Sequence, residues 1–289
     1  MKKVLFATTA LIASAGIAAA DGHSSVTVGG YGFAGVVNNG TDTDVSSRVR
    51  LTFAATVETD AGVTFSAGAR MNISNNTVDA NSVIADGTDS SANTSLERGF
   101  VRMTADGLTV TVGATNGAMR SLARQATFFG FNDGGTLGFD NSDGGGNAFA
   151  RNSDANDVVY AAYETGGLTI GLSSDTAGNT AELAARYEVG SVSFGVGIND
   201  DDGWMLGVEY SGGALGVEVG INSESTLMVG LAYDVSSTFT ISAALQDGDD
   251  GDVIGIQGDY DLGGANLIGA IGQNKADDTV ASLGVIFSF

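Results

Sequence analysis

The sequence contains no cysteine, no proline and one histidine, His23. Without cysteine the chain can form neither a disulfide framework nor a thiolate metal site. One histidine near the start of the chain gives no basis for a catalytic triad or a histidine-rich metal site. Basic residues are also scarce, 12 against 34 acidic ones. The composition therefore argues against an enzyme and against nucleic acid as a partner, since nucleic acid needs a basic footprint.

Long hydrophobic runs are absent apart from one at the start of the chain. Lys2 and Lys3 precede an apolar stretch over residues 4–17, and three alanines follow before Asp21. This stretch is shorter than the roughly 20 apolar residues of a spanning helix. A positive start, an apolar core and small residues at the end are typical of a secretory signal peptide. We therefore expect residues 1–20 to be a signal peptide and residues 21–289 to form one domain.

Apolar and polar residues alternate through most of the remaining chain. The segment 192–199, VSFGVGIN, places a large apolar residue at every second position. Strict alternation predicts a strand with one apolar and one polar face. Most of these segments run about ten residues, the length of a tilted strand that crosses a bilayer. Sixteen such segments start near Ser24, Val45, Gly62, Ser95, Gly107, Asp157, Gly166, Gly178, Gly190, Gly203, Gly213, Ser225, Ser236, Gly251, Gly264 and Ala276.

The connections between these segments alternate between tight turns and longer, often acidic loops, which is typical of an outer-membrane barrel. One tyrosine precedes each of five tight turns, and aromatic rings at one height form an interfacial girdle. These are Tyr163, Tyr187, Tyr210, Tyr233 and Tyr260. A soluble β-sandwich is disfavoured, because so polar and glycine-rich an inner face cannot build a dry core. The pattern predicts an all-β, sixteen-stranded antiparallel transmembrane β-barrel.

Two segments resemble the alphaproteobacterial general porins. Tyr260–Phe289, YDLGGANLIGAIGQNKADDTVASLGVIFSF, resembles their last hairpin, and Val45–Gly68, VSSRVRLTFAATVETDAGVTFSAG, resembles their second and third strands. The terminal Phe289, with Phe287 before it, is similar to the signature that the barrel assembly machinery recognises. The resemblance implies an outer-membrane homotrimer in contact with lipid and lipopolysaccharide. It also implies passive diffusion of small hydrophilic solutes and ions, with Thr115–Asn156 as a loop 3 folded into the pore.

Several charged residues are candidates for a pore constriction. Arg48 and Arg50 share one face of a predicted strand, and their neighbours Val49 and Leu51 take the lipid face. An arginine facing lipid at mid-depth costs about 2–4 kcal/mol, so the arginines are expected in the lumen. Arg70 follows on the lumen face of the next strand. The opposing carboxylates predicted on loop 3 are Asp133, Asp140 and Asp143.

Other charges leave questions open or point to the mouth of the channel. Arg98 and Arg102 share a face with Phe100, so the direction in which these arginines point stays open. Further acids are expected on the lumen face and predict weak cation selectivity that fades with salt. They are Glu182, Glu188, Glu209, Glu218 and Asp259. Calcium, which prefers oxygen ligands, is the one cofactor that the acidic loops suggest. The candidate ligands are Asp247, Asp249, Asp250 and Asp252, with a flexible acidic loop as the alternative.

Two alternatives to a general diffusion channel remain open at this stage. A substrate-specific channel of the same fold needs a continuous aromatic slide on the lumen face, and no such series is in phase. An outer-membrane adhesin or enzyme needs a recognition surface or catalytic groups. Only the second and third long loops are long enough for such a surface, and the shortage of histidine disfavours catalysis.

Overall fold

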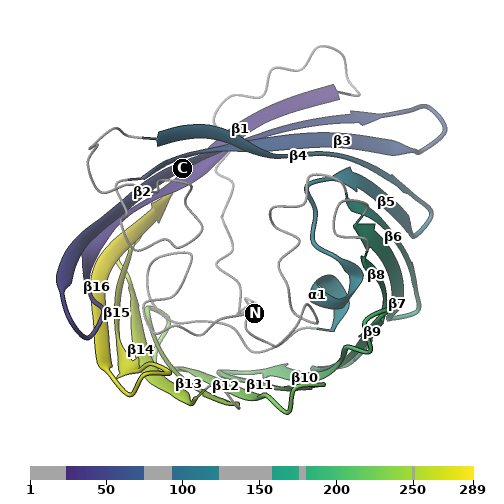
Figure 1. Ribbon diagram of the computed structural model, residues 1–289. Helices are drawn as coiled ribbons and strands as arrows, with labels where there is room; N and C mark the ends of the chain where they lie inside the picture. The colour runs from purple at the N-terminus through teal and green to yellow at the C-terminus, as the bar shows by residue number, and fades with distance from the viewer. Residues whose placement is uncertain (1–23, 75–92, 124–157, 176–179, 249–250) are drawn as a thin grey trace.

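The computed structural model describes residues 24–74, 93–123, 158–175, 180–248 and 251–289, and there the chain forms one closed antiparallel barrel (Figure 1). The first eight strands are β1 (Ser24–Asn38), β2 (Thr43–Glu58), β3 (Thr64–Ser74), β4 (Asn93–Ala105), β5 (Leu108–Gly113), β6 (Val158–Thr165), β7 (Leu168–Asp175) and β8 (Thr180–Val189). The other eight are β9 (Val192–Asn199), β10 (Trp204–Gly212), β11 (Leu215–Asn222), β12 (Leu227–Asp234), β13 (Phe239–Asp247), β14 (Val253–Asp261), β15 (Asn266–Gln273) and β16 (Thr279–Ser288). A short helix, α1 (Ala118–Leu122), lies inside the ring.

The predicted fold class is confirmed, and each predicted strand start lies within three residues of an observed one. The expected signal peptide, residues 1–20, lies outside the described residues and stays a prediction. Within the part of the chain that the structure describes, no helix is long and apolar enough to cross a membrane.

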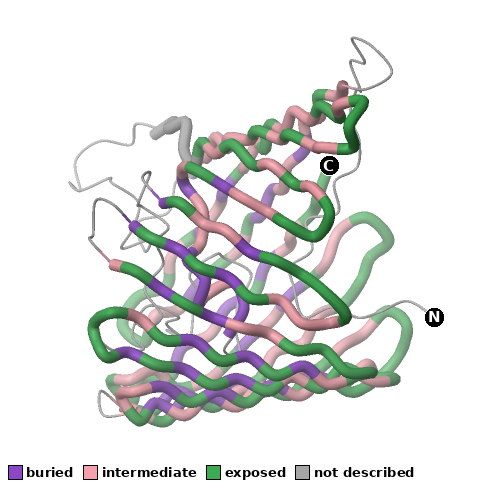
Figure 2. Tube along the Cα trace, turned by 90° about the vertical axis from the view of Figure 1, so that its right-hand side faces the viewer, coloured by how far each residue is buried: buried purple, intermediate pink, exposed green. Residues whose placement is uncertain are grey.

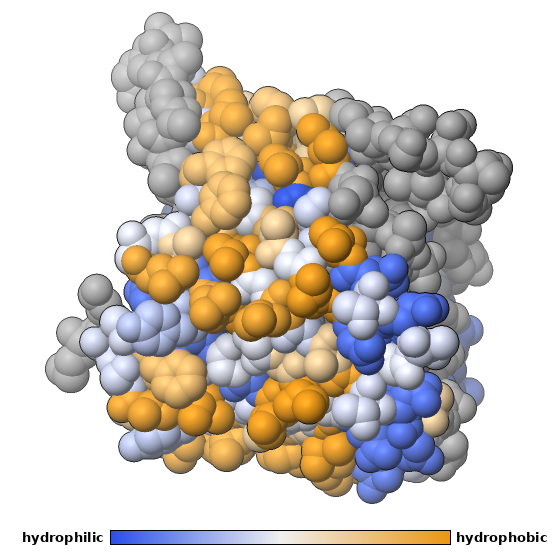
Figure 3. All heavy atoms as spheres, turned by 90° about the vertical axis from the view of Figure 1, so that its left-hand side faces the viewer, coloured by the Kyte–Doolittle hydropathy of each residue, from blue (hydrophilic) through white to orange (hydrophobic). Residues whose placement is uncertain are grey.

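The two faces of the barrel differ in the way that the alternation predicts. On β9, Phe194 and Val196 are exposed on the outer face, whereas Ser193, Gly195 and Gly197 are buried on the inner face. Figure 2 shows this alternation of buried and exposed positions along neighbouring strands. Figure 3 shows hydrophobic side chains over much of the side of the outer wall that faces the viewer. An apolar outer band is the surface that a membrane-spanning barrel presents to lipid.

The tight-turn end carries the predicted aromatic girdle. All five tyrosines that precede tight turns are exposed on the outer face, between 38 and 52 %. In four of the five turns beside them a glycine adopts the left-handed region, for example with φ of 60° at Gly190 and 61° at Gly213. Glycine takes this conformation without the steric penalty of a Cβ atom. Five outward tyrosines at one end are placed as expected for rings at a lipid–water boundary.

The last residue of the chain helps to close the barrel. The Gly30 N–H donates to the Phe289 carbonyl at 2.8 Å, and the Phe289 N–H donates to the Gly30 carbonyl at 3.0 Å. These bonds continue the ladder between β1 and β16, which pairs Tyr31 with Ser288. Closure leaves no unpaired strand edge in this part of the wall, as a barrel in lipid requires.

The inner face is not polar throughout, contrary to the sequence-based expectation. Ile268 on β15 is buried inside the barrel with Phe33 and Val37 of β1. A second inner cluster joins Met228, Val253, Ala270 and Val280. β15 therefore carries apolar residues on both faces, which explains why its sequence alternates poorly. These clusters give parts of the inner wall a packed apolar layer.

Three turns at the long-loop end share one hydrogen-bonding pattern. The side-chain oxygen of Asn274 accepts from the N–H groups of Ala276 at 3.0 Å and Asp278 at 2.9 Å. Asn199 and Asn222 accept from the residues two and four positions later in the same way. Asparagine favours such turns because its side chain replaces a backbone acceptor.

The Asn274→Ala variant is expected to unfold at lower urea concentration, because it leaves two turn N–H groups without their acceptor. The expected loss is about 1–2 kcal/mol. Urea unfolding of the protein in lipid vesicles measures it. Asn274→Asp is the matched control, since it retains an acceptor oxygen at the same place. A midpoint for Asn274→Ala equal to that of the parent would contradict the role of this turn.

Candidate functional site

The basic side of the lumen is built on β1 and β2, which pair Phe33 with Arg48 and Tyr31 with Arg50. The Arg48 guanidinium carbon lies 5.6 Å from the centre of the Phe33 ring, and that of Arg50 lies 4.9 Å from the Tyr31 ring. The two rings are stacked, with centroids 6.3 Å apart. Cation–π contacts of this length hold a guanidinium against a ring face. The neighbouring Val49 is 40 % exposed on the outer face.

The basic side continues onto β3 and β4. Arg50 Nε donates to Asn72 Oδ1 of β3 at 2.7 Å. Arg70 is opposite Thr52 and shares its face, although a register shift occurs between Gly68 and Arg70. The cationic wall that the sequence predicts is thus carried by two neighbouring strands whose register places all three arginines on the lumen face.

The structure also decides the direction of Arg102. Its Nε donates to Thr111 Oγ1 at 3.0 Å, and Thr111 is fully buried on the inner face of β5. Its guanidinium carbon lies 5.3 Å from the centre of the Phe100 ring. Val101 between them is 56 % exposed on the outer face. Arg102 and Phe100 therefore both face the lumen as a cation–π pair, whereas the Arg98 side chain lies outside the described ones.

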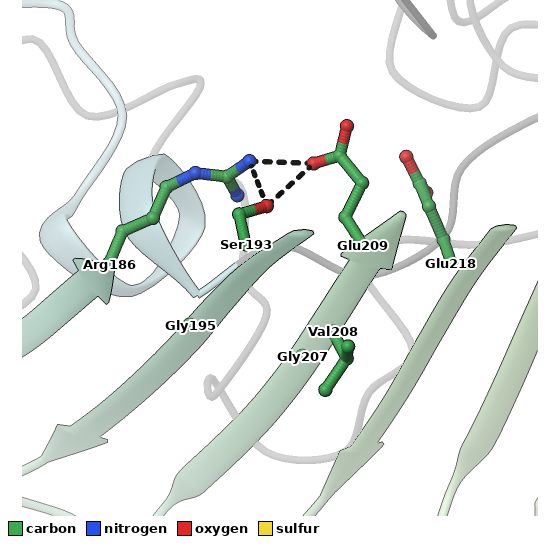
Figure 4. Close-up of a pocket in the computed structure, with 7 residues that line it drawn as sticks. All are labelled: Arg186, Ser193, Gly195, Gly207, Val208, Glu209 and Glu218. Atoms are coloured by element: carbon green, nitrogen blue, oxygen red, sulfur yellow. Dashed lines mark hydrogen bonds and ion pairs between the residues drawn. The ribbon is translucent and has the colours of Figure 1, made fainter. Parts of the chain in front are cut away.

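A second charged cluster, here called the Arg186 cluster, lies on β8–β11 and comprises Arg186, Glu188, Ser193, Glu209 and Glu218. Arg186 Nη2 donates to Glu209 Oε2 and to Ser193 Oγ, both at 2.6 Å, as Figure 4 shows. Arg186 Nε donates to Glu188 Oε1 at 3.0 Å. The ion pair with Glu209 is largely shielded, whereas the Glu188 side chain is 64 % exposed.

The register explains the electrostatic character of this cluster. Glu209 lies directly opposite Ser193 on one side and Glu218 on the other. Like charges opposite each other on neighbouring strands repel, and Arg186 offsets this only in part. Three carboxylates and one guanidinium leave this wall with a net negative charge.

The basic side and the Arg186 cluster lie across the barrel from each other. The closed order of sixteen strands places β2 and β3 half a ring away from β10 and β11, as Figure 1 shows. The lumen is therefore lined by arginines on one wall and by glutamates on the opposite wall. Opposed charged walls can orient polar solutes and hinder apolar ones.

Helix α1 follows β5 and covers the inner face of β7–β9 beside the Arg186 cluster. Ala118, Met119 and Ala123 are fully buried there, with Leu122 at 6 %. The prediction that Thr115–Asn156 folds into the pore as loop 3 stays a prediction, because residues 124–157 lie outside the described residues.

Several predicted site residues cannot be placed. Asp133, Asp140 and Asp143 lie outside the described residues, and so do Asp249 and Asp250. The remaining calcium candidates, Asp247 and Asp252, are exposed at the ends of β13 and β14. Among the described residues, no group of three or more histidines, cysteines or acids is placed to hold a metal ion.

Sequence reasoning missed the aromatic rings beneath the arginines. No inward-facing ring was predicted at Tyr31 or Phe33, and the direction of Phe100 was left open together with that of Arg102. For Phe100 the sequence carries a signal, because Arg102 lies two positions later on the same face of the strand. Tyr31 and Phe33 meet Arg50 and Arg48 of the neighbouring strand, so only the strand register identifies these two contacts. The bonds of Arg186 to Ser193 and Glu209 were also missed, because they join three different strands.

Comparison with known proteins gives one family match and several structural matches. The model of a family described as Gram-negative porin matches residues 7–286. No curated protein sequence matches the chain. One mutant of the Rhodopseudomonas blastica porin superposes with a TM-score of 0.74 at 22% identity, covering 91% of this chain and 100% of that one. A triple mutant of that porin superposes with a TM-score of 0.73 at 22% identity. A structure titled "Asymmetric conductivity of engineered proteins" superposes with a TM-score of 0.73 at 24% identity, and both matches cover 91% of this chain and 100% of the other.

Proposed function

The chain belongs to the Gram-negative porin family, and we propose that it forms a water-filled outer-membrane channel for passive diffusion of small hydrophilic solutes and ions. The observation that carries this proposal is a closed barrel with an apolar outer face and a lumen lined by opposed charged walls. The outer face suits lipid and lipopolysaccharide, and the charged inner walls suit water and polar solutes. Export by the signal peptide predicted at residues 1–20 belongs to the same proposal.

A liposome swelling assay with sugars of increasing size tests this function. We expect swelling rates that fall smoothly as the sugar grows, because passive diffusion depends on solute size relative to the opening. Rapid uptake of one sugar and exclusion of smaller ones would instead indicate a substrate-specific channel. No swelling by any sugar, from protein that is folded in the vesicles, would favour an adhesin or an enzyme.

The proposed constriction combines the basic wall with loop 3. Arg48, Arg50 and Arg70 supply the positive side, and Arg102 extends it onto β4. The carboxylates proposed to face them on loop 3 are Asp133, Asp140 and Asp143. The cation–π and hydrogen-bond contacts of the arginines support this proposal, because they hold the guanidinium groups in fixed positions.

Homotrimer formation is the second part of the proposal. Small residues such as Ala67 on the outer face of β3 permit close approach of two barrels. We expect an oligomer that resists SDS at room temperature and dissociates to monomer on boiling. Gel mobility before and after heating measures this, with native mass spectrometry in mild detergent as a second reading. A monomer in mild detergent would contradict the trimer.

Calcium binding at the acidic loop of residues 247–252 is the third part. Clustered carboxylates repel one another within a screening length of about 8–10 Å, and calcium relieves that repulsion. We expect a lower melting temperature after chelation and recovery when calcium is added back. A variant with neutral residues at Asp247 and Asp252 is the control and is expected to lose part of the response. Identical melts with and without chelator would favour a flexible acidic loop.

A further inference from the structure

Helix α1 is joined to the barrel wall by a buried carboxylate. Glu182 of β8 is 7 % exposed, and its Oε2 accepts hydrogen bonds from the Met119 N–H at 3.1 Å and from Ser173 Oγ at 2.9 Å. Ser173 Oγ in turn accepts from the Ala118 N–H at 2.8 Å. The first N–H groups of a helix have no partner within it, so these two wall residues satisfy them.

The wall beneath α1 is shaped to receive it. A Cβ atom at Gly195 would lie 2.5 Å from the Leu122 carbonyl oxygen and 2.7 Å from Ala123 Cα. One at Gly197 would lie 2.7 Å from Met119 Cγ. Real Cβ atoms do not approach backbone atoms so closely, so a larger residue at Gly195 would displace α1, whereas at Gly197 the flexible Met119 side chain would have to shift. The glycines of β9 thus form a shallow seat on the inner face, beside the Glu182 contact.

The helix is too short to hold this position by itself. Five residues form little more than one turn, and isolated helices of that length are not stable in water. Its place therefore depends on the wall. A carboxylate that accepts from a backbone N–H makes a stronger bond than a neutral acceptor does. This contact is buried, so competing water is excluded from it.

We infer that Glu182, assisted by Ser173, is a positioning residue that fastens α1 to the wall and thereby keeps the lumen open to the diffusing solute. The inference rests on the proposed channel function, because it concerns the width of the same lumen. When the contact is lost, α1 leaves its seat for part of the time and enters the path between the basic wall and the Arg186 cluster.

The first test measures the position of α1 without any ion flow. Ala123, at the C-terminal end of α1, is fully buried against the wall, and the chain has no native cysteine. A single Ala123→Cys substitution therefore reports undocking through its rate of labelling by a maleimide in detergent. We expect Glu182→Ala to raise that rate about tenfold, the effect of losing one charge-assisted hydrogen bond. Ser173→Ala is expected to raise the labelling rate less than Glu182→Ala does. The labelling rate of Glu182→Gln is expected to lie between those of Glu182→Ala and the parent.

The second test restores the contact covalently. A Cβ atom at Gly197 would lie 3.3 Å from Ala123 Cβ, close to the roughly 3.5–4.5 Å of a disulfide. Ala123→Cys with Gly197→Cys can therefore link α1 to β9 once the flexible Met119 side chain shifts. In the Glu182→Ala background, we expect frequent partial closures of single channels under reducing conditions. Oxidation is expected to return the conductance trace to that of the parent.

The outcomes separate this inference from the proposed function. Equal labelling and equal closure frequency in Glu182→Ala and the parent would overturn the positioning role. A channel that never conducts, combined with faster labelling, would overturn the channel function and leave the role of Glu182 intact. Unchanged heat-dependent gel mobility confirms that each barrel is folded. If Glu182→Ala does not fold, the labelling rate and the closure frequency are measured in Glu182→Gln and Ser173→Ala instead.

Discussion

Replacement of both Arg48 and Arg50 by glutamine is expected to shift the channel further toward cations and to raise its conductance. The unmodified channel is expected to be weakly cation-selective, because acids outnumber basic residues 34 to 12. One unit charge about 7 Å from an ion in water changes the ion's energy by about 0.6 kcal/mol, roughly a factor of three. Loss of two such charges is expected to raise the cation-to-anion permeability ratio severalfold at low salt.

The measurement is the reversal potential across a planar bilayer under a salt gradient. The shift is expected to shrink at about 1 M salt, where the screening length is only about 3 Å. The double lysine variant is the matched control, since it keeps both charges and loses the planar groups that lie over Tyr31 and Phe33. Its selectivity is expected to stay near that of the parent. An unchanged potential in the glutamine variant at low salt would show that other charges govern permeation.

Neutralisation of the opposite wall is expected to have the reverse effect. Glu188→Gln with Glu209→Gln leaves the Arg186 cluster with one carboxylate, Glu218, and one guanidinium. Removal of two negative charges from the lumen wall is expected to lower the cation-to-anion permeability ratio severalfold at low salt, by the same factor of about three per charge. The weak cation preference is then expected to disappear or to change to an anion preference.

Arg186→Gln is the control of opposite sign in the same network. It removes the guanidinium that bonds to Glu188, Ser193 and Glu209 and leaves their charges in place. The cation-to-anion permeability ratio of Arg186→Gln is therefore expected to rise. Both variants disturb the same hydrogen bonds, so a shift in the same direction from both would indicate a structural disturbance. Heat-dependent gel mobility verifies that the two variants are folded.

The strands were predictable because their signal is local. A side chain two positions away lies on the same face, so alternation in a segment such as 192–199 is enough to identify a strand and its lipid-facing side. The long-range closure through Gly30 and Phe289 followed the expected topology as well. Alternation did not predict the packing of apolar residues that face inward, such as Phe33 and Ile268, because it gives residue type and not the packing partner.

The sequence by itself determined that this protein is a barrel with an apolar outside, tight turns at one end and a shortage of catalytic groups, since periodicity and composition act residue by residue. The tertiary structure decided which charges meet. The pairs Arg186 with Glu209 and Glu182 with Met119 join residues 23 and 63 positions apart. Their contact depends on strand register and on the curvature of a closed sheet, so it exists only once the whole ring has formed.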